Sequence, residues 1–268
     1  MRSVGDLMNL QGRVGLITGG AGFLGSVMGQ ALAELGATVV LLDIEREQCL
    51  KIAGEIEEQY EVEVLPLVVD MEDEGDLRSV VDQVLTCFGR LDILVHCAAL
   101  VGTSKLSGWD VPFDEQSVET WRKALGMNLT APFILTQSCE AALTTSGHGS
   151  VINIGSIYGV VGADPSLYEG TPMGGIPGAY AASKGGLLQW TRWLATALAP
   201  QVRVNSITMG GVWRGQHEAF HRRYKERTPL KRMATEEDVK GAIAYLASDL
   251  SQYVTGQNLV VDGGWTAW

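Results

Sequence analysis

The sequence predicts an α/β fold, a doubly wound parallel sheet with helices on both faces. Short apolar runs alternate with helical stretches along the chain, which is the pattern of consecutive βαβ units. The apolar runs are continuous, as expected for strands that helices cover on both sides. The first run leads into a glycine-rich turn that opens a helix, and right-handed crossovers make a doubly wound sheet the simplest topology.

Each element has its own signal in the sequence. The expected strands are the apolar runs at 14–18, 38–43, 62–70, 91–97, 149–154, 202–208 and 258–262. The helical patterns between them lie at 26–35, 45–60, 74–88, 117–146, 179–198 and 235–248. Gly36 and Gly89 end two helices, since glycine adopts the left-handed conformation of a helix end. Pro132 predicts a kink or two abutting helices within 117–146, and Thr235 with Asp238 three residues later opens the last helix.

The composition is that of one globular domain over residues 1–268, with 46% hydrophobic and 19% charged residues. A formal net charge of −11 argues against nucleic acid or an anionic membrane as a partner. The sequence has no apolar stretch of about 18 residues and no secretory signal at its N-terminus. Its four cysteines form no CxxC pair, so a disulfide framework or a metal site is not expected. The same cysteine usage predicts a reducing compartment, and therefore a cytoplasmic location.

A nucleotide site is predicted where the first strand meets the first helix, at Thr-Gly-Gly-Ala-Gly-Phe-Leu-Gly, residues 18–25. Glycines allow the backbone to approach a diphosphate, and the helix N-terminus offers free N–H groups and a positive dipole end. The sheet is therefore expected to be of the Rossmann type. The alternative is a glycine-rich turn that holds no ligand.

Asp43 ends the second expected strand and bears on the choice of cofactor. A carboxylate there accepts hydrogen bonds from the ribose hydroxyls of NAD and repels the extra phosphate of NADP, so NAD is the expected cofactor. Arg46, in the next turn, would weaken this preference if it swung over. The alternative is a solvated aspartate at a strand end.

Tyr180 and Lys184 are four positions apart in an expected helix, so they share one helix face. A cation beside a phenol favours the phenolate and lowers its pKa from about 10, which makes a tyrosine usable as an acid/base near neutral pH. Together with the glycine-rich turn, this pair resembles the short-chain dehydrogenase/reductase family in its shorter, single-domain branch, over about residues 12–264.

The resemblance implies a catalytic set. Tyr180 corresponds to the family's catalytic tyrosine, and Lys184 to the lysine that binds the nicotinamide ribose and lowers the tyrosine pKa. Ser156 corresponds to the serine that holds the substrate oxygen, Asn128 to the asparagine that supports a proton-relay water, and Asp70 to the acid at the adenine edge. Taken singly, Ser156 is also compatible with a turn serine, Asn128 with a bridge at a helix kink and Asp70 with a helix cap. The residues implied in cofactor binding are Gly19, Gly22, Phe23, Leu24, Gly25, Asp43, Asp70, Met71, Ala98, Tyr180, Lys184, Gly210 and Val212.

The sequence departs from the family pattern in four places. Phe23 replaces the second glycine of the turn, which resembles the turn of the larger epimerase and dehydratase branch. His96 replaces an asparagine that ties strands together, so it is expected to be structural. Met209 replaces a proline after the sixth strand. Ser156 and Tyr180 are about twice as far apart as usual, with roughly 163–176 as the extra stretch.

The substrate pocket is expected to involve Ser156, Tyr168 and Arg214 and the loops near 102–116, 163–177 and 211–232. The third loop is dense in basic residues, and arginine suits carboxylate or phosphate, so an anionic sugar is one expected substrate. The alternative is a solvated helix face or a subunit contact. The sequence around Tyr158 and Tyr168 also resembles a bacterial subgroup from pathways for unusual sugars, which favours a sugar-derived or polyhydroxylated substrate.

The expected activity is an NAD-dependent interconversion of a secondary alcohol and a ketone. A homotetramer or homodimer is expected because this family usually pairs its long helices. Two other functions stay open. A sugar-nucleotide epimerase or dehydratase that uses NAD transiently agrees with the glycine turn. The second substrate domain of such enzymes, however, is not expected in this sequence. A non-catalytic NAD-binding sensor would not need the complete Asn–Ser–Tyr–Lys set.

Overall fold

Seven parallel strands form one sheet in the computed structural model, which describes residues 1–102 and 104–268. Their order is β3-β2-β1-β4-β5-β6-β7, so the direction of winding reverses between β1 and β4. The predicted doubly wound parallel sheet is confirmed. Residue 103, part of the expected loop 102–116, lies outside the described residues. The strands are β1 (Val14–Thr18), β2 (Thr38–Asp43), β3 (Val64–Val68), β4 (Ile93–His96), β5 (Gly149–Ser156), β6 (Val202–Met209) and β7 (Asn258–Val261).

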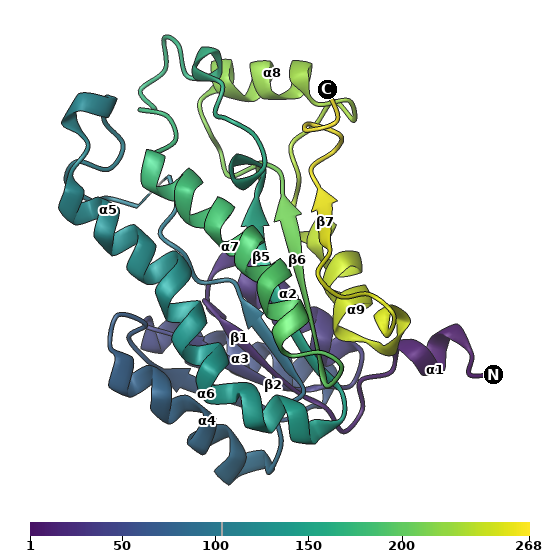
Figure 1. Ribbon diagram of the computed structural model, residues 1–268. Coiled ribbons are helices and arrows are strands. Elements are labelled where there is room, and N and C mark those ends of the chain that lie inside the picture. The colour runs from purple at the N-terminus through teal and green to yellow at the C-terminus, as the bar shows by residue number, and fades with distance from the viewer. Residues whose placement is uncertain (103) are drawn as a thin grey trace.

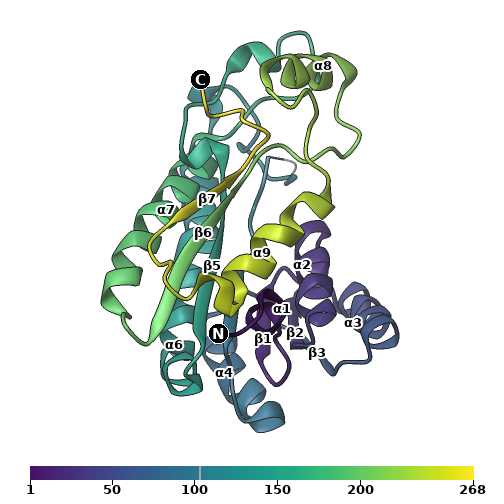
Figure 2. The ribbon, with the colours of Figure 1, turned by 90° about the vertical axis from the view of Figure 1, so that its right-hand side faces the viewer.

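Helices cover both faces of the sheet, as Figure 2 shows from the side. One layer holds α2 (Phe23–Glu34), α3 (Arg46–Tyr60) and α9 (Lys240–Ala247), and the other holds α4 (Glu74–Phe88), α6 (Ala131–Ser146) and α7 (Gly178–Ala197). α8 (Glu218–Arg227) lies beyond the carboxyl ends of the strands, with the C-terminus beside it (Figure 1). The remaining helices are α1 (Val4–Met8), α5 (Val118–Leu125), the π-helical turn η2 (Gly126–Thr130), and the 3-10 turns η1 (Phe113–Glu115), η3 (Ile157–Gly159), η4 (Pro165–Leu167), η5 (Glu236–Val239) and η6 (Asp249–Ser251).

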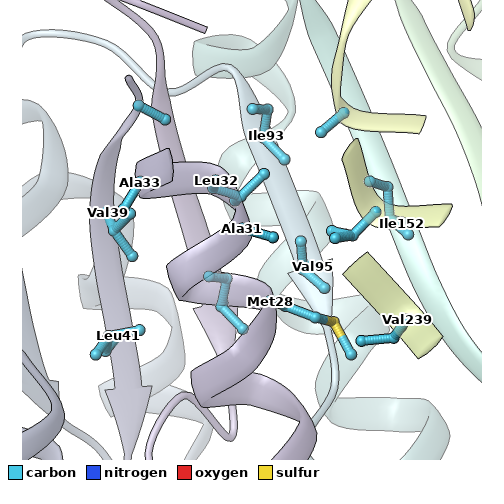
Figure 3. Close-up of a cluster of buried hydrophobic side chains, with 14 of the residues drawn as sticks. Met28, Ala31, Leu32, Ala33, Val39, Leu41, Ile93, Val95, Ile152 and Val239 are labelled. Atoms are coloured by element: carbon cyan, nitrogen blue, oxygen red, sulfur yellow. The ribbon is translucent and has the colours of Figure 1, made fainter. Parts of the chain in front are cut away.

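The core on one side of the sheet is built around α2 (Figure 3). Met28 and Leu32 of α2 are completely buried among side chains of the central strands, including Ile93 and Val95 of β4. Gly15 of β1 makes room for this contact, because a Cβ there would lie 2.8 Å from a methyl carbon of Leu32. Truncating a buried leucine typically costs about 2–5 kcal/mol, so this packing fixes the position of α2 and of the glycine turn before it.

The structure refines several of the predicted elements. α2 begins at Phe23, three residues before the expected start at 26, because the glycine turn passes directly into the helix. The stretch 117–146 is two helices joined by the π-helical turn Gly126–Thr130, so the alternative of two abutting helices is the correct one. Pro132 lies in the first turn of α6, where its missing N–H is not needed, and so it does not break the helix itself.

Candidate active site

A cavity of about 1020 Å³ opens at the carboxyl ends of the strands, around the point where the winding reverses. Segments that are far apart in the sequence line it, including those that follow β1, β2, β4, β5 and β6. Most of the residues expected in the site share this lining: Gly19, Gly22, Phe23, Leu24, Gly25, Asp43, Ala98, Ser156, Tyr168, Tyr180, Lys184, Gly210, Val212 and Arg214.

The glycine turn brings the backbone of α2 directly to the cavity. The Gly22 N–H donates to the Gly19 carbonyl at 3.0 Å, and Gly19 has a positive φ of 67°. A Cβ on Gly25 would lie 2.0 Å from the Gly19 oxygen, so only glycine allows this turn and this helix to pack. Within the described residues no side chain caps α2, which leaves N–H groups of its first turn free for an anion. The turn therefore fits the diphosphate of a dinucleotide.

Asp43 is held at the edge of this turn. Its Oδ2 accepts from the Ala21 N–H at 2.9 Å, and its Oδ1 accepts from the Glu45 N–H at 3.2 Å. These bonds fix the carboxylate where it lines the cavity beside the glycines. Carboxylate oxygens retain further lone pairs after two such bonds, so Asp43 fits the ribose hydroxyls of NAD.

Tyr180 lies in the first turn of α7, next to the end of β5. Its N–H donates to the Pro177 carbonyl at 3.0 Å, which starts the helix and brings the phenol toward Ser156. Burial raises the pKa of Tyr180, and a hydrogen bond with Ser156 acts in the opposite direction. The tyrosine is therefore protonated at neutral pH in this structure.

Lys184 lies one helical turn after Tyr180 and is buried. Its Nζ donates to the Ile154 carbonyl of β5 at 2.7 Å and lies 5.9 Å from the centre of the Tyr180 ring. Burial lowers the pKa of Lys184 to about 8. Burial of the phenol is the largest influence on the Tyr180 pKa in this structure. A lowering of that pKa by Lys184 stays a prediction.

Asn128 lies in the π-helical turn and joins two parts of the site. Its Oδ1 accepts from the Leu100 N–H at 2.7 Å, while its Nδ2 donates to the Leu100 carbonyl and to Ser183 Oγ, both at 3.0 Å. Ser183 Oγ in turn donates to the Tyr180 carbonyl at 2.8 Å. Asn128 thus fixes the loop after β4 against α7. It is next in sequence to a residue of the cavity wall but is not itself part of that wall.

The residues after β3 lie apart from this group. Asp70 is exposed, and its Oδ1 accepts from the Glu72 N–H at 2.9 Å, while Met71 is buried in the core among side chains of α4. Neither belongs to the lining of the cavity in the described structure. His96 is buried at the end of β4 with its Nε2 2.8 Å from Thr136 Oγ1, and burial lowers its pKa to about 3. This buried position agrees with the structural role expected for His96.

An aromatic wall lines the cavity, and Tyr168 is the one residue of it that the sequence predicts for the substrate pocket. The hydroxyls of Tyr158 and Tyr168 are 3.1 Å apart, and burial raises the pKa of Tyr168 to about 12. Phe220 packs against Tyr168 with ring centres 5.2 Å apart, and Tyr224 OH accepts from the Gly211 N–H at 2.6 Å. Trp265 lies behind Tyr158 and Tyr224. The placement of Tyr158 two residues after Ser156 was the available signal for it.

The basic residues of 211–232 mostly bind the protein itself. Arg223 donates to the carbonyls of Leu167 and Glu169 at 3.2 and 2.6 Å, and Arg227 pairs with Asp164, so α8 is joined to the insert 163–177. Arg232 pairs with Asp238 at 2.6 Å, and Lys231 donates to the Glu226 carbonyl. Among the basic residues of that segment, Arg214 alone is part of the described cavity lining. The basic residues of the loop 211–232 therefore form largely a structural network.

Arg214 lies at the glycine turn. Its guanidinium carbon is 3.9 Å from the centre of the Phe23 ring, and its Nη1 is 3.4 Å from Glu236 Oε1. The sequence predicts Arg214 in the substrate pocket. The structure places its side chain at the start of α2, because the loop after β6 turns back over that helix.

Across residues 1–102 and 104–268, no helix is long and apolar enough to cross a membrane. The same residues contain no cluster of His, Cys, Asp and Glu side chains that could hold a metal ion.

Comparison with known proteins agrees with this geometry. The family profile described as enoyl-(acyl carrier protein) reductase matches residues 21–266. A 3-oxoacyl-(acyl-carrier-protein) reductase of Thermotoga maritima is 32% identical over 96% of this chain and 99% of its own. A short-chain type dehydrogenase/reductase from Mycobacterium marinum has a TM-score of 0.86 at 29% identity, with 100% of both chains covered.

A second solved structure has a more specific description. It is a gluconate 5-dehydrogenase from Burkholderia cenocepacia J2315 in complex with NADP and tartrate, which has a TM-score of 0.85 at 26% identity and covers 99% of this chain and 100% of its own. The family profile and these relatives match this chain along almost its whole length. This protein is a single-domain member of the short-chain dehydrogenase/reductase family, and it is an oxidoreductase that acts on CH–OH groups.

Proposed function

We propose that this enzyme interconverts a secondary alcohol and a ketone and prefers NAD to NADP. One observation carries the proposal: Ser156, Tyr180 and Lys184 meet in a cavity whose other end is a glycine turn flanked by Asp43. The related gluconate 5-dehydrogenase holds NADP, so the preference rests on this chain's own carboxylate. Asp43, fixed by two backbone N–H groups, is suited to ribose hydroxyls and unsuited to an added phosphate.

The residues of the site divide the proton chemistry among them. NAD, when bound, supplies the hydride acceptor for alcohol oxidation. Ser156 Oγ orients the substrate oxygen, and the Tyr180 oxygen takes the hydroxyl proton in oxidation or donates it in reduction. The raised pKa of Tyr180 favours the protonated form, which is the form needed to reduce a ketone. Lys184 binds the nicotinamide ribose, and Asn128, through Ser183, holds the backbone that positions Tyr180.

A sugar-derived or polyhydroxylated substrate suits the wall opposite the glycine turn. The paired hydroxyls of Tyr158 and Tyr168 lie near Tyr180 and offer donors and acceptors to a second hydroxyl of the substrate. The rings of that wall and the side chains of Met173 and Met233 provide apolar contact for the C–H groups of such a molecule. The gluconate 5-dehydrogenase among the solved relatives also acts on a sugar acid.

The first experiment measures the formation of NADH from NAD, or of NADPH from NADP, at 340 nm with a panel of polyols, sugar acids and cyclic alcohols. Stoichiometric NADH from a polyol supports the proposal. Substrate conversion without net NADH would instead identify an epimerase or dehydratase, and tight NAD binding without conversion would identify a sensor.

A second experiment tests the cofactor preference. Asp43→Ser should lower the ratio of kcat/KM with NAD to kcat/KM with NADP, and the exposed Glu47→Ser of α3 is the control. A wild-type enzyme that prefers NADP would contradict the cofactor assignment.

We also propose that copies of this chain pair through α6 and α7 as a homotetramer or homodimer in the cytoplasm. Phe133 of α6 and Trp193 of α7 are 45% and 61% exposed, which is unusual for side chains of that size. Light scattering of the wild type and of Trp193→Ser tests this assembly. A monomeric wild type would contradict it.

A further inference from the structure

We propose that Arg214 closes over the diphosphate of the dinucleotide, with the ring of Phe23 as the platform that holds its guanidinium above the glycine turn. The inference rests on the proposed cofactor site. It assigns Arg214 to the cofactor, where the sequence had assigned it to the substrate, and it gives a role to the phenylalanine that replaces the family's second glycine.

The contact between Phe23 and Arg214 is the first observation. The guanidinium carbon lies 3.9 Å from the ring centre, well within the distance at which a cation is attracted to an aromatic face. Phe23 is the first residue of α2, and its side chain is 70% exposed although it is large and apolar. Both side chains line the cavity at the glycine turn. An exposed ring at this place is explained by the cation that it holds.

The loop that carries Arg214 is fixed by hydrogen bonds at its base. The Ala234 N–H donates to the Gly211 carbonyl at 2.9 Å, and the Trp213 N–H donates to the Ala234 carbonyl at 2.8 Å. The Arg214 N–H then donates to Gln216 Oε1, also at 2.8 Å. The arginine therefore starts from an ordered backbone, and less conformational entropy is lost when its side chain binds an anion.

Charge favours a diphosphate at this place. Glu236 of η5 is the one acidic partner of Arg214 among the described residues, at 3.4 Å, which is longer than a good charge-assisted hydrogen bond. The free N–H groups at the start of α2 carry only partial positive charge, whereas a guanidinium supplies a full charge and a planar fork that matches phosphate oxygens. Burial also lowers the pKa of Arg214, as expected for a guanidinium partly withdrawn from water toward the cavity.

The direct test is the binding of NADH, ADP-ribose and adenosine to the folded protein, measured by calorimetry without any alcohol substrate. Arg214→Ala is expected to weaken NADH and ADP-ribose by at least about tenfold and to leave adenosine, which has no phosphate, unchanged. Arg214→Lys should recover only part of the loss, because lysine lacks the planar fork. Phe23→Leu should give an intermediate loss. Arg222→Ala, at an exposed position of α8, is the matched control and should bind all three as the wild type does.

Salt dependence provides a second measurement. The affinity of the wild type for ADP-ribose should fall with ionic strength more steeply than that of Arg214→Ala, because the variant lacks the screened charge. ADP-ribose affinity within about twofold of wild type in Arg214→Ala would overturn the inference. Retained adenosine binding shows that the variant is folded. A wild type that binds none of the three ligands would instead refute the proposed cofactor site, so the two failures are distinguishable.

Discussion

Replacing Lys184 with methionine is expected to stabilise the protein at neutral pH while it abolishes turnover. Lys184 is buried, and burial lowers its pKa from 10.5 to about 8. The unfolded chain then holds the proton more tightly than the folded chain, so the charged lysine opposes folding. Below pH 8 the charged lysine lowers the free energy of unfolding by its full amount. As the pH increases from 8 to 10.5, the folded protein loses this charge and the free energy of unfolding of the wild type rises.

The size of the effect follows from the difference of about 2.5 between 10.5 and 8. At about 1.36 kcal/mol for each pKa unit, the buried charge costs about 3 kcal/mol at pH 7 and less than about 1 kcal/mol at pH 10.5. Methionine also loses the 2.7 Å hydrogen bond to the Ile154 carbonyl, at a cost of about 1–2 kcal/mol for an unsatisfied buried acceptor. The net expectation is a gain of about 1–2 kcal/mol at pH 7 that becomes a loss near pH 10.5.

Urea unfolding followed by tryptophan fluorescence at pH 7, 8, 9 and 10 measures this difference. Other ionisable groups are common to both proteins, so the difference in the free energy of unfolding isolates Lys184. Lys51→Met, on the exposed side of α3, is the control and should show no trend with pH. Curves for the wild type and Lys184→Met that run parallel across this range, or a variant that is less stable at pH 7, would refute the reasoning.

Three further expectations concern single side chains. Tyr180→Phe should lower kcat by at least about 100-fold and leave the Kd for NADH unchanged. Because burial raises the pKa of Tyr180, kcat/KM of the wild type for alcohol oxidation should rise with pH from 7 to 9. A flat pH profile would contradict Tyr180 as the acid/base. Gly25→Ala should abolish NADH binding, measured by fluorescence, because its Cβ would lie 2.0 Å from the Gly19 oxygen; near-normal binding would show that the turn tolerates a side chain. Tyr168→Phe should raise KM for a polyol several-fold and leave KM for a simple secondary alcohol unchanged, because it removes the hydroxyl that pairs with Tyr158. Equal changes of KM for both substrates would count against the aromatic wall as the site of a second substrate hydroxyl.

Local patterns in the sequence were sufficient for the sheet and for much of the site. The strands of a parallel sheet are continuous apolar runs, so their positions along the chain could be predicted. The glycine turn and the pair Tyr180–Lys184 are likewise short motifs whose geometry is set by one turn or one helix. Ser156 and Tyr180 belong to no such short motif, and the resemblance to the family was the reason to expect them together.

Side chains whose position depends on distant partners could not be placed in this way. Arg214 is near Gly210 in sequence, but Phe23 and Glu236 determine where its guanidinium lies. The basic run that includes Arg223 suggested an anion-binding surface, whereas backbone carbonyls of the insert satisfy that side chain. The net pKa of Tyr180 also depends on burial, which a helical spacing does not report.

The joining of the insert to α8 affects how this enzyme can change its specificity. Arg223 and Arg227 come from one segment, and the Leu167 and Glu169 carbonyls and the Asp164 carboxylate that they bind come from the other. Substitution of either segment alone would leave unpaired charges, or carbonyls without their donor, in its neighbour. Evolution toward a new substrate, or a designed transplant of the pocket onto another scaffold, therefore has to exchange 163–177 and 211–232 as one inherited unit.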